Sequence, residues 1–246
     1  MATMARVRSA AVALSLVPTS GRSLDVRLSL IHSGAGSSAT PPSRPTHFLS
    51  LRLPDPALHA NVASVQAAIV ANEKRARGCE VPPEKSHLTA FVLSLTDASV
   101  EQAKAALADC ASLVAPASSP PRIRISGLGS FRQQVVFAQL QPSDDLDRVA
   151  ALVRGAHQIF DARGLSPPAH DSWTPHLTLL KISRVGKPRK GKPTPKLPAA
   201  AYEDLPASSL DFGEHELGSL ELCSMQGLGA DGYYPVLASV SLDGRS

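Results

Sequence analysis

The sequence has few cysteines and no long apolar run, and each of these shortages excludes a class of protein. Its three cysteines, Cys79, Cys110 and Cys223, are odd in number and show no Cys-x-x-Cys spacing. Such a set argues against a disulfide framework and against a cysteine-ligated zinc site, and it favours a reducing compartment. No uninterrupted apolar stretch approaches the length of a membrane-spanning helix, so we expect no membrane association.

What the sequence does contain fits a globular protein with an anionic ligand. The chain has 246 residues, of which 43% are apolar, enough to bury a sizeable core. This length permits one large domain or one domain with tails. The net charge of +4 suits a ligand such as a nucleotide, although many basic proteins bind nothing charged.

The N-terminal segment, residues 1–45, differs from the rest. It is rich in serine and alanine, and it has three arginines but no acidic residue before Asp25. This composition is typical of an organellar presequence, and a disordered tail has the same features. The protein is accordingly predicted to be mitochondrial or cytoplasmic. Residues 33–45 are rich in Gly, Ser and Pro, which indicates a linker, so the folded domain is expected over residues 46–246.

From residue 46 onward, strand-like and helix-like patterns alternate. Apolar residues at helical spacing predict three helices, of which one is capped by Asp97 and one is ended by Gly164. The helices are expected over residues 56–76, 97–113 and 143–163. Strands are expected over residues 47–53, 87–95, 176–183, 214–224 and 233–242, with a hairpin of 122–125 and 134–140 around Gly127 and Gly129. This mixture predicts an α+β or a mixed α/β class.

The chain contains an internal duplication. Residues 47–95 and 134–183 each supply a strand, a long helix and a second strand that opens with His-Leu-Thr. The repeat predicts a two-lobed fold with pseudo-twofold symmetry. In such a fold the two triplets would face each other across a central groove.

The two triplets are His87-Leu88-Thr89 and His176-Leu177-Thr178. In a strand, residues i and i+2 point to the same face, so each triplet presents an imidazole beside a hydroxyl while its leucine packs behind. Two histidines can serve as base and acid at neutral pH, and two threonine hydroxyls can donate hydrogen bonds to phosphoryl oxygens. The pattern predicts phosphodiester chemistry that needs no metal and no cofactor.

Two other interpretations of the triplets are possible. Histidines in strands can be satisfied by hydrogen bonds within a core. Two histidines can also ligate zinc, but the sequence has no His-Glu-x-x-His motif and no third ligand at helical spacing.

The paired triplets on a duplicated β-α-β scaffold resemble the 2H phosphoesterase superfamily. Within it, the sequence is most similar to the nucleotide-binding 2H domain of an A-kinase anchoring protein. The similarity runs from about residue 46 to 242 and includes several further segments in one order. They are FLSLRL (48–53), GLGSFRQQVVFAQL (127–140), SWTPHLTLLKIS (172–183), FGEHELGSLELCSM (212–225) and DGYYPVL (231–237).

The resemblance implies a bilobal α+β fold, LigT-like, with two antiparallel sheets flanking a central groove and helices outside. It implies that His87 and His176 are catalytic and that Thr89 and Thr178 bind phosphate. The expected activity is cleavage of 2′,5′-linked oligoadenylate or RNA. Alternatives are a 2′,3′-cyclic phosphodiesterase or RNA 3′-end processing enzyme, or a non-catalytic AMP- or CMP-binding module.

The expected partner is a nucleotide or a short RNA or oligoadenylate, bound by a monomer. In the anchoring protein, an amphipathic helix that grips a kinase regulatory subunit follows this domain. The sequence ends at Ser246 without such a helix, so we expect no kinase regulatory subunit as partner.

Several other residues are weaker candidates. Trp173, Tyr233 and Tyr234 could stack on a base, although core packing is equally plausible for Trp173. Because side chains alternate along a strand, only one of the two tyrosines is expected to face the groove. Strand alternation predicts that Lys181 points away from the face of His176. The segment 184–196 holds six basic residues and no acidic one. Such a segment can guide an RNA backbone or serve as a targeting signal. It can also be a solvated loop without a function of its own.

Overall fold

The computed structural model describes residues 44–116, 118–165, 167, 173–184 and 195–244. All of them belong to one compact unit, residues 41–246. The predicted N-terminal segment, apart from its last two residues, lies outside the described residues, as do residues 185–194 of the basic segment. Among the described residues, no helix has the length and apolarity needed to cross a membrane.

The described chain alternates strands and helices, which confirms the α+β class. The strands are β1 (His47–Arg52), β2 (His87–Leu93), β3 (Arg122–Phe131), β4 (Val135–Leu140), β5 (His176–Lys181), β6 (Asp211–Glu216), β7 (Ser219–Ser224) and β8 (Val236–Ser241). The α-helices are α1 (Pro56–Asn72), α2 (Asp97–Asp109), α3 (Asp144–Ala162) and α4 (Ala200–Glu203). Short 3₁₀ helices are η1 (Lys74–Ala76), η2 (Pro83–Lys85), η3 (Cys110–Leu113), η4 (Ile182–Arg184) and η5 (Ala207–Leu210).

Local sequence explains where the helices begin and end. The Ser143 side chain caps α3 by accepting a hydrogen bond from the Leu146 amide, and three aspartates occupy the first turn, where the helix dipole favours negative charge. Gly164 follows the end of α3 with a φ of +72°, as predicted. The cap of α2 is Thr96, which forms a capping box with Ser99, rather than the predicted Asp97.

Three predicted strand features were wrong. The β3–β4 hairpin turns at Arg132 and Gln133, which have positive φ, whereas Gly127 lies inside β3 at a register shift. The predicted strand 214–224 is two strands, β6 and β7, which pair with different neighbours, β3 and β1. Strand β8 begins at Val236, so Tyr233 and Tyr234 precede it.

The strands form one eight-stranded antiparallel sheet in the order β6-β3-β4-β5-β2-β1-β7-β8. The expectation of two separate sheets is therefore corrected. The two four-stranded halves are joined through β2 and β5 by a single registered pair, Leu88 with Leu177. The sheet is continuous because the backbones of the two triplets lie side by side at this seam.

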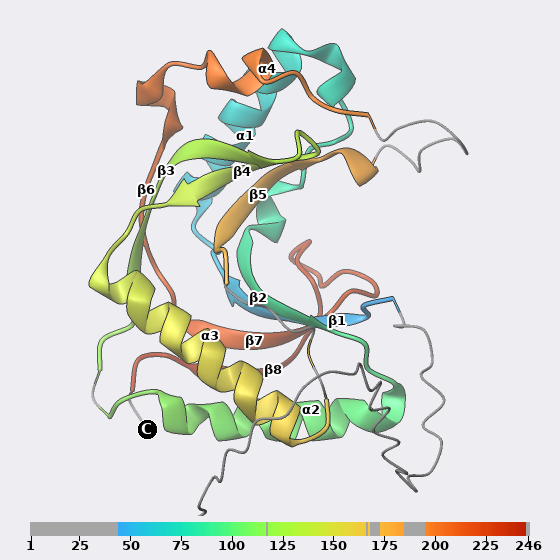
Figure 1. Cartoon of the computed structure of the whole chain (residues 1–246), viewed down its shortest axis with the longest axis vertical. Coiled ribbons are helices and arrows are strands. Elements are labelled where there is room, and N and C mark those ends of the chain that lie inside the picture. Colours follow the sequence, from blue (N-terminus) through green and yellow to red (C-terminus); the bar gives the residue numbers. More distant parts are fainter. Residues whose placement is uncertain (1–43, 117, 166, 168–172, 185–194, 245–246) are drawn as a thin grey trace, which may run out of the picture. The chain divides into compact units, whose positions relative to one another are not determined.

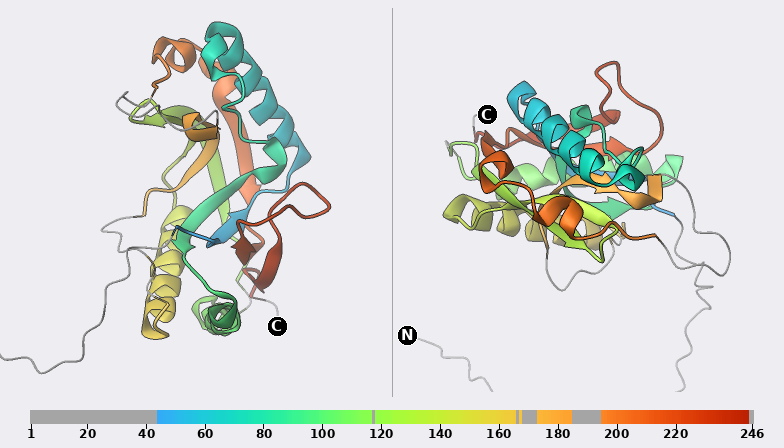
Figure 2. Two further views of the ribbon diagram at one scale, coloured as in Figure 1. Left: turned by 90° about the vertical axis from the view of Figure 1, so that its right-hand side faces the viewer. Right: turned by 90° about the horizontal axis from the view of Figure 1, so that it is seen from above.

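The arrangement about the seam is symmetric in order. Outward from it, one half runs β2, β1, β7, β8 and the other runs β5, β4, β3, β6. Helix α1 contacts β5 and β6 of the second half, and α2 contacts β7 and β8 of the first half. Figure 1 shows α2 and α3 together beside the half that contains β7 and β8, with α1 and α4 beside the other half. The side view in Figure 2 separates these two helical layers.

Candidate active site

The two triplets begin strands β2 and β5, with their leucines buried and their histidines and threonines partly exposed. Leu88 and Leu177 are 0% and 1% exposed, which confirms that they pack into the core behind the site. Because Leu88 pairs with Leu177 in antiparallel register, each histidine lies across the seam from the threonine of the other triplet. The four polar side chains therefore share one face of the sheet with the histidines on a diagonal.

Each triplet strand has a β-bulge directly after its threonine. Ser50 pairs with Thr89 and Leu49 pairs with Phe91, which leaves Ala90 as the extra residue in β2. The same shift in β5 leaves Leu179 without a partner in β4. A bulge interrupts strand alternation, so the residue three positions after the threonine returns to the face of the triplet.

A cavity of about 390 Å³ opens on this face. It is lined by both threonines and His87. Val92 and Lys181, which the two bulges turn toward the same face, also line it. Its other walls are Phe48, Val81, Ser183, Arg184, Met225 and Tyr234. This volume lies within the range of pockets that bind small molecules such as nucleotides.

Both histidines are held in the same orientation by a backbone carbonyl two residues earlier. Nδ1 of His87 lies 2.7 Å from the Lys85 oxygen, and Nδ1 of His176 lies 2.8 Å from the Thr174 oxygen. A carbonyl oxygen only accepts hydrogen bonds, so Nδ1 carries the proton in each ring. Each neutral ring therefore leaves its Nε2 to accept a proton, and Nε2 of His87 lies 3.1 Å from the Thr89 hydroxyl.

Aromatic rings surround each imidazole. The His87 ring contacts Phe48 at a centroid distance of 5.0 Å and Tyr234 at 5.9 Å. The His176 ring contacts Phe131 at 4.9 Å and Phe137 at 5.2 Å. Apolar rings around an imidazole disfavour its charged form, so both histidines are biased toward the neutral base.

The pKa values of the two histidines differ. Burial lowers the pKa of His87 to about 4, against the raising effect of its bond to the Lys85 carbonyl, and the charges of His176 and Lys85 lower it further. Burial also lowers the pKa of His176, the Thr174 carbonyl opposes this, and the charge of Lys181 adds to the lowering. Paired titratable groups in unequal surroundings are a feature of acid–base sites.

Comparison with known proteins places this geometry in a family. The model of the AKAP7 2′5′ RNA ligase-like domain matches residues 45–242, most of the chain. The chain belongs to this family. It is thus a 2H phosphoesterase domain, as the sequence indicated, and the family supports phosphodiesterase chemistry in general.

One curated relative is human A-kinase anchor protein 7 isoform gamma, which is 26% identical over 201 residues. The match covers 80% of this chain and 57% of that protein, so the chain spans little more than half of the relative's length. Among solved structures, TT0787 of Thermus thermophilus is 25% identical with a TM-score of 0.49, covering 81% of this chain and 98% of that one. E. coli LigT complexed with 3′-AMP is 17% identical with a TM-score of 0.49, covering 80% and 98%.

The 2H domain places the three aromatic candidates differently. Tyr234 lines the cavity and is available to a base. Tyr233 is 0% exposed, so its ring is not accessible to a base; its hydroxyl lies 2.5 Å from the Ser50 hydroxyl instead. Of the two adjacent tyrosines, Tyr234 is thus the one that faces the cavity. Trp173 donates its indole N–H to the Thr89 carbonyl at 2.9 Å, which ties the approach to β5 to the other triplet strand.

Lys181 was predicted to lie on the surface and away from the site. Its side chain is exposed, but it also lines the cavity, so the second part of the prediction was wrong. Simple alternation fails because the bulge at Leu179 shifts the phase of β5 by one residue. Lys181 consequently lines the same cavity as Thr178.

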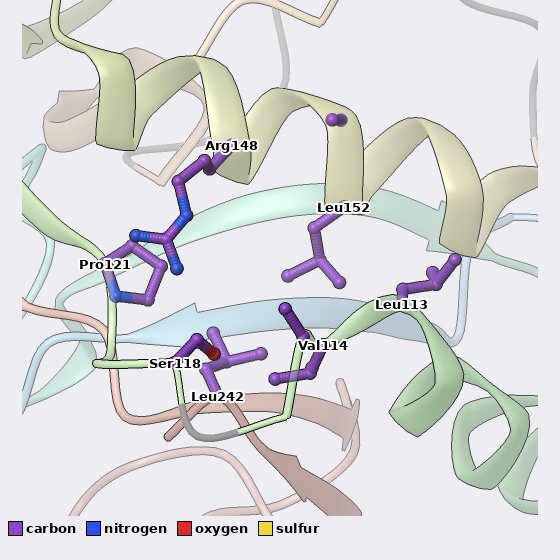
Figure 3. Close-up of a pocket in the computed structure, with 9 residues that line it drawn as sticks. Leu113, Val114, Ser118, Pro121, Arg148, Leu152 and Leu242 are labelled. Atoms are coloured by element: carbon purple, nitrogen blue, oxygen red, sulfur yellow. The ribbon is translucent and has the colours of Figure 1, made fainter. Parts of the chain in front are cut away.

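Another cavity of the 2H domain, about 370 Å³, lies between α3 and the segment after η3 (Figure 3). Its walls are mainly apolar, with Leu113, Leu152 and Leu242 among them. Arg148 reaches into it but forms an ion pair with Asp145 at 2.6 Å. No histidine, cysteine or carboxylate is among its lining residues, so it offers no acid–base pair. Within the described part of the chain, no cluster of three or more metal-ligating side chains is found.

Proposed function

We propose that this 2H domain is a metal-independent phosphodiesterase that acts on 2′,5′-linked oligoadenylate or RNA. The observation that carries the proposal is the pair of imidazoles with matched Nδ1 anchors, which lie on a diagonal with the two threonine hydroxyls at the seam between β2 and β5. His87 and both threonines line the cavity at this seam. One phosphodiester can lie between the four groups. The name of the matching family, a 2′5′ RNA ligase-like domain, supports the choice of linkage.

The roles of the two histidines follow from their surroundings. His87 has the more strongly depressed pKa and stays neutral, so it acts as general base through Nε2. It takes a proton from a water molecule or a neighbouring ribose hydroxyl, whose oxygen then forms a bond to phosphorus. A bound phosphate anion raises the pKa of both imidazoles, and His176 carries the proton that the leaving oxygen receives when its bond to phosphorus breaks.

The threonines stabilise the negative charge on the phosphoryl oxygens. Thr89 and Thr178 line the cavity from opposite sides of the seam, and their hydroxyls donate to the two non-bridging oxygens. For this the Thr89 hydroxyl turns away from Nε2 of His87, where the attacking hydroxyl of the substrate or water takes its place as donor. Tyr234 supplies the partly exposed ring against which a base packs.

A substrate panel on the purified full chain tests the proposal. The panel holds 2′,5′- and 3′,5′-linked dinucleotides and 2′,3′-cyclic nucleotides, with excess chelator and chromatography of the products. We expect cleavage of the 2′,5′ linkage that persists in chelator. Preferred cleavage of the cyclic phosphate would indicate the alternative, a 2′,3′-cyclic phosphodiesterase or an RNA 3′-end processing enzyme, which the same four residues would serve.

A non-catalytic module is the competing interpretation. Tight binding of AMP or CMP without turnover of any panel member would establish it and overturn the enzymatic proposal. His59 provides a matched control for the catalytic variants, because it is a histidine of α1 that contacts the Leu53 carbonyl and does not line the cavity.

A further inference from the structure

Three cations lie at one end of the cavity, and the proposed chemistry uses none of them. Lys181 and Arg184 line the cavity directly. The Lys85 ammonium lies 4.7 Å from the centroid of the Tyr234 ring, which is itself part of the wall. We call Lys85, Lys181 and Arg184 the basic edge.

The basic edge forms no ion pair with a described carboxylate, although Glu84 precedes Lys85 and Glu80 pairs with Leu180 next to Lys181. The residues that line the cavity include no Asp or Glu. The pKa of Lys85 is lowered, first by burial and then by the charge of Arg184, as expected when two cations approach each other without an anion between them.

The basic edge extends away from the place of the scissile phosphate, although the charges of Lys85 and Lys181 also act on the two histidines. That phosphate lies at the seam, between the two triplets. Lys181 follows Thr178 by three residues, a distance of roughly 8–10 Å along a strand, and Arg184 comes one 3₁₀ turn later. A group bound at the seam therefore leaves the basic edge open to a neighbouring group of the same ligand.

The charges also exceed what one diester supplies. A phosphodiester carries a single negative charge, and both histidines are biased toward the neutral form. Three fixed cations facing one anion leave a surplus of positive charge. A second phosphate on the adjacent nucleotide would match that surplus with charge-assisted hydrogen bonds.

We propose that Lys85, Lys181 and Arg184 form a second phosphate subsite, which selects substrates that carry a phosphate beside the linkage to be cleaved. This inference rests on the proposed function and narrows its substrate class. The preferred substrate is then a phosphorylated dinucleotide or a longer oligonucleotide rather than a dinucleoside monophosphate.

The test compares substrates that differ by one phosphate. We would measure kcat and KM for a 2′,5′-linked diadenosine monophosphate and for the same molecule with an added 5′- or 3′-terminal phosphate. We expect the better-placed phosphate to raise kcat/KM about tenfold at low salt, mainly through KM. The gain should shrink as salt is added, since contacts between phosphates and cations weaken with ionic strength.

Substitutions in the basic edge test whether its cations cause the gain in kcat/KM from the added phosphate. Arg184→Gln should remove much of the gain and leave kcat/KM for the single-phosphate substrate unchanged within about twofold. Lys181→Gln and Lys85→Gln should also remove much of the gain. Because the charges of Lys181 and Lys85 act on the pKa values of His176 and His87, the readout for these two variants is the ratio of kcat/KM between the two substrates. Lys74→Gln and Arg154→Gln are the controls, because each removes one exposed positive charge outside the cavity. Both controls should keep the full gain.

Two results would overturn the subsite. One is that neither terminal phosphate changes kcat/KM. The other is that the three variants lose activity equally on all substrates, because the cations would then serve the scissile phosphate or only steer ligands toward the cavity.

Binding measurements keep this test separate from the test of the proposed function. Affinities for adenosine 3′-monophosphate and adenosine 3′,5′-bisphosphate can be compared by calorimetry even if nothing is cleaved. Tighter binding of the bisphosphate that is lost in Lys181→Gln would support the subsite in a chain without phosphodiesterase activity. Equal affinities together with normal cleavage would reject the subsite alone.

Discussion

The two sides of the seam carry the same three residues in different surroundings. On the His87 side, the neighbouring rings of Phe48 and Tyr233 are 3% and 0% exposed. On the His176 side, the ring of Phe131 is 38% exposed, and a lysine replaces the valine that follows the first triplet. Duplication thus supplied two equal pairs of groups, and the packing around them made one pair more buried than the other. That difference allows one imidazole to act as base and the other as acid.

The largest expected effect comes from removing either imidazole. His87→Ala and His176→Ala should each lower kcat by about 10³-fold or more, because each removes a proton-transfer group from the transition state. Single-turnover cleavage of the preferred dinucleotide measures this, with His59→Ala as a control that keeps most of its activity. Full activity in either variant, with an unchanged circular dichroism spectrum, would contradict the assigned roles.

The two histidines should contribute differently to the loss of stability at acidic pH. The unfolded chain protonates His87 near pH 6.5, whereas the folded chain does so only near pH 4. Between these values the unfolded state binds more protons, so stability is full above pH 6.5 and falls as the pH decreases toward 4. A shift of this size corresponds to roughly 3–4 kcal/mol.

Denaturant unfolding of the wild type and of His87→Gln at pH 7 and pH 4.5 measures this contribution. The variant should lose less stability on acidification than the wild type does. His176→Gln should show the same change to a smaller extent, since its imidazole is the less buried of the two. An acid sensitivity that is equal in all three proteins would remove the distinction between the two sides.

Trp173 connects the two sides of the seam. Its substitution should have an effect on activity and stability that is smaller than the loss of an imidazole. The Trp173→Phe substitution removes the indole donor from the Thr89 carbonyl and leaves a gap beside the core. We expect a loss of about 1–2 kcal/mol of stability and a lower kcat with little change in KM, because the seam between β2 and β5 would be less firmly held. Thermal unfolding and steady-state kinetics test the two parts. A pure change in KM would indicate instead that Trp173 contacts the substrate.

The sequence alone was sufficient for the α+β class, the triplets and the burial of their leucines. These features depend on strand alternation and on a repeat that is visible along the chain. The bulges at Ala90 and Leu179 were not predicted, because an extra residue is defined only against the partner strand. The error at Lys181 follows directly from that omission.

Long-range contacts account for the other differences. The continuous sheet depends on a pairing between residues 89 positions apart, Leu88 and Leu177, which no local pattern encodes. The unequal pKa values of two identical triplets depend on rings contributed by other strands and loops, such as Phe48 and Tyr234. Residue type and spacing therefore indicated the chemistry, but the environment of each group required the fold.

Substitutions at Tyr233 and Tyr234 should have the smallest effects, and they test the difference between the core and the cavity wall next to His87. They are adjacent in sequence, yet Tyr233 is buried with its hydroxyl on Ser50, whereas Tyr234 lines the cavity. Tyr233→Phe leaves the Ser50 hydroxyl without this partner inside the core, which should cost about 1 kcal/mol. Tyr234→Phe should change stability by less than about 0.5 kcal/mol and should keep substrate binding, because the ring is retained.

Tyr234→Ala is the complementary variant, and it should raise KM several-fold if a base packs on that ring. Denaturant titration and steady-state kinetics on all three variants separate the two tyrosines. If Tyr233→Phe proved neutral while Tyr234→Phe destabilised the fold, their roles would be reversed. The ring that shields His87 from solvent would then be Tyr234, and the low pKa of that histidine would depend on the wall of the cavity rather than on the core behind it.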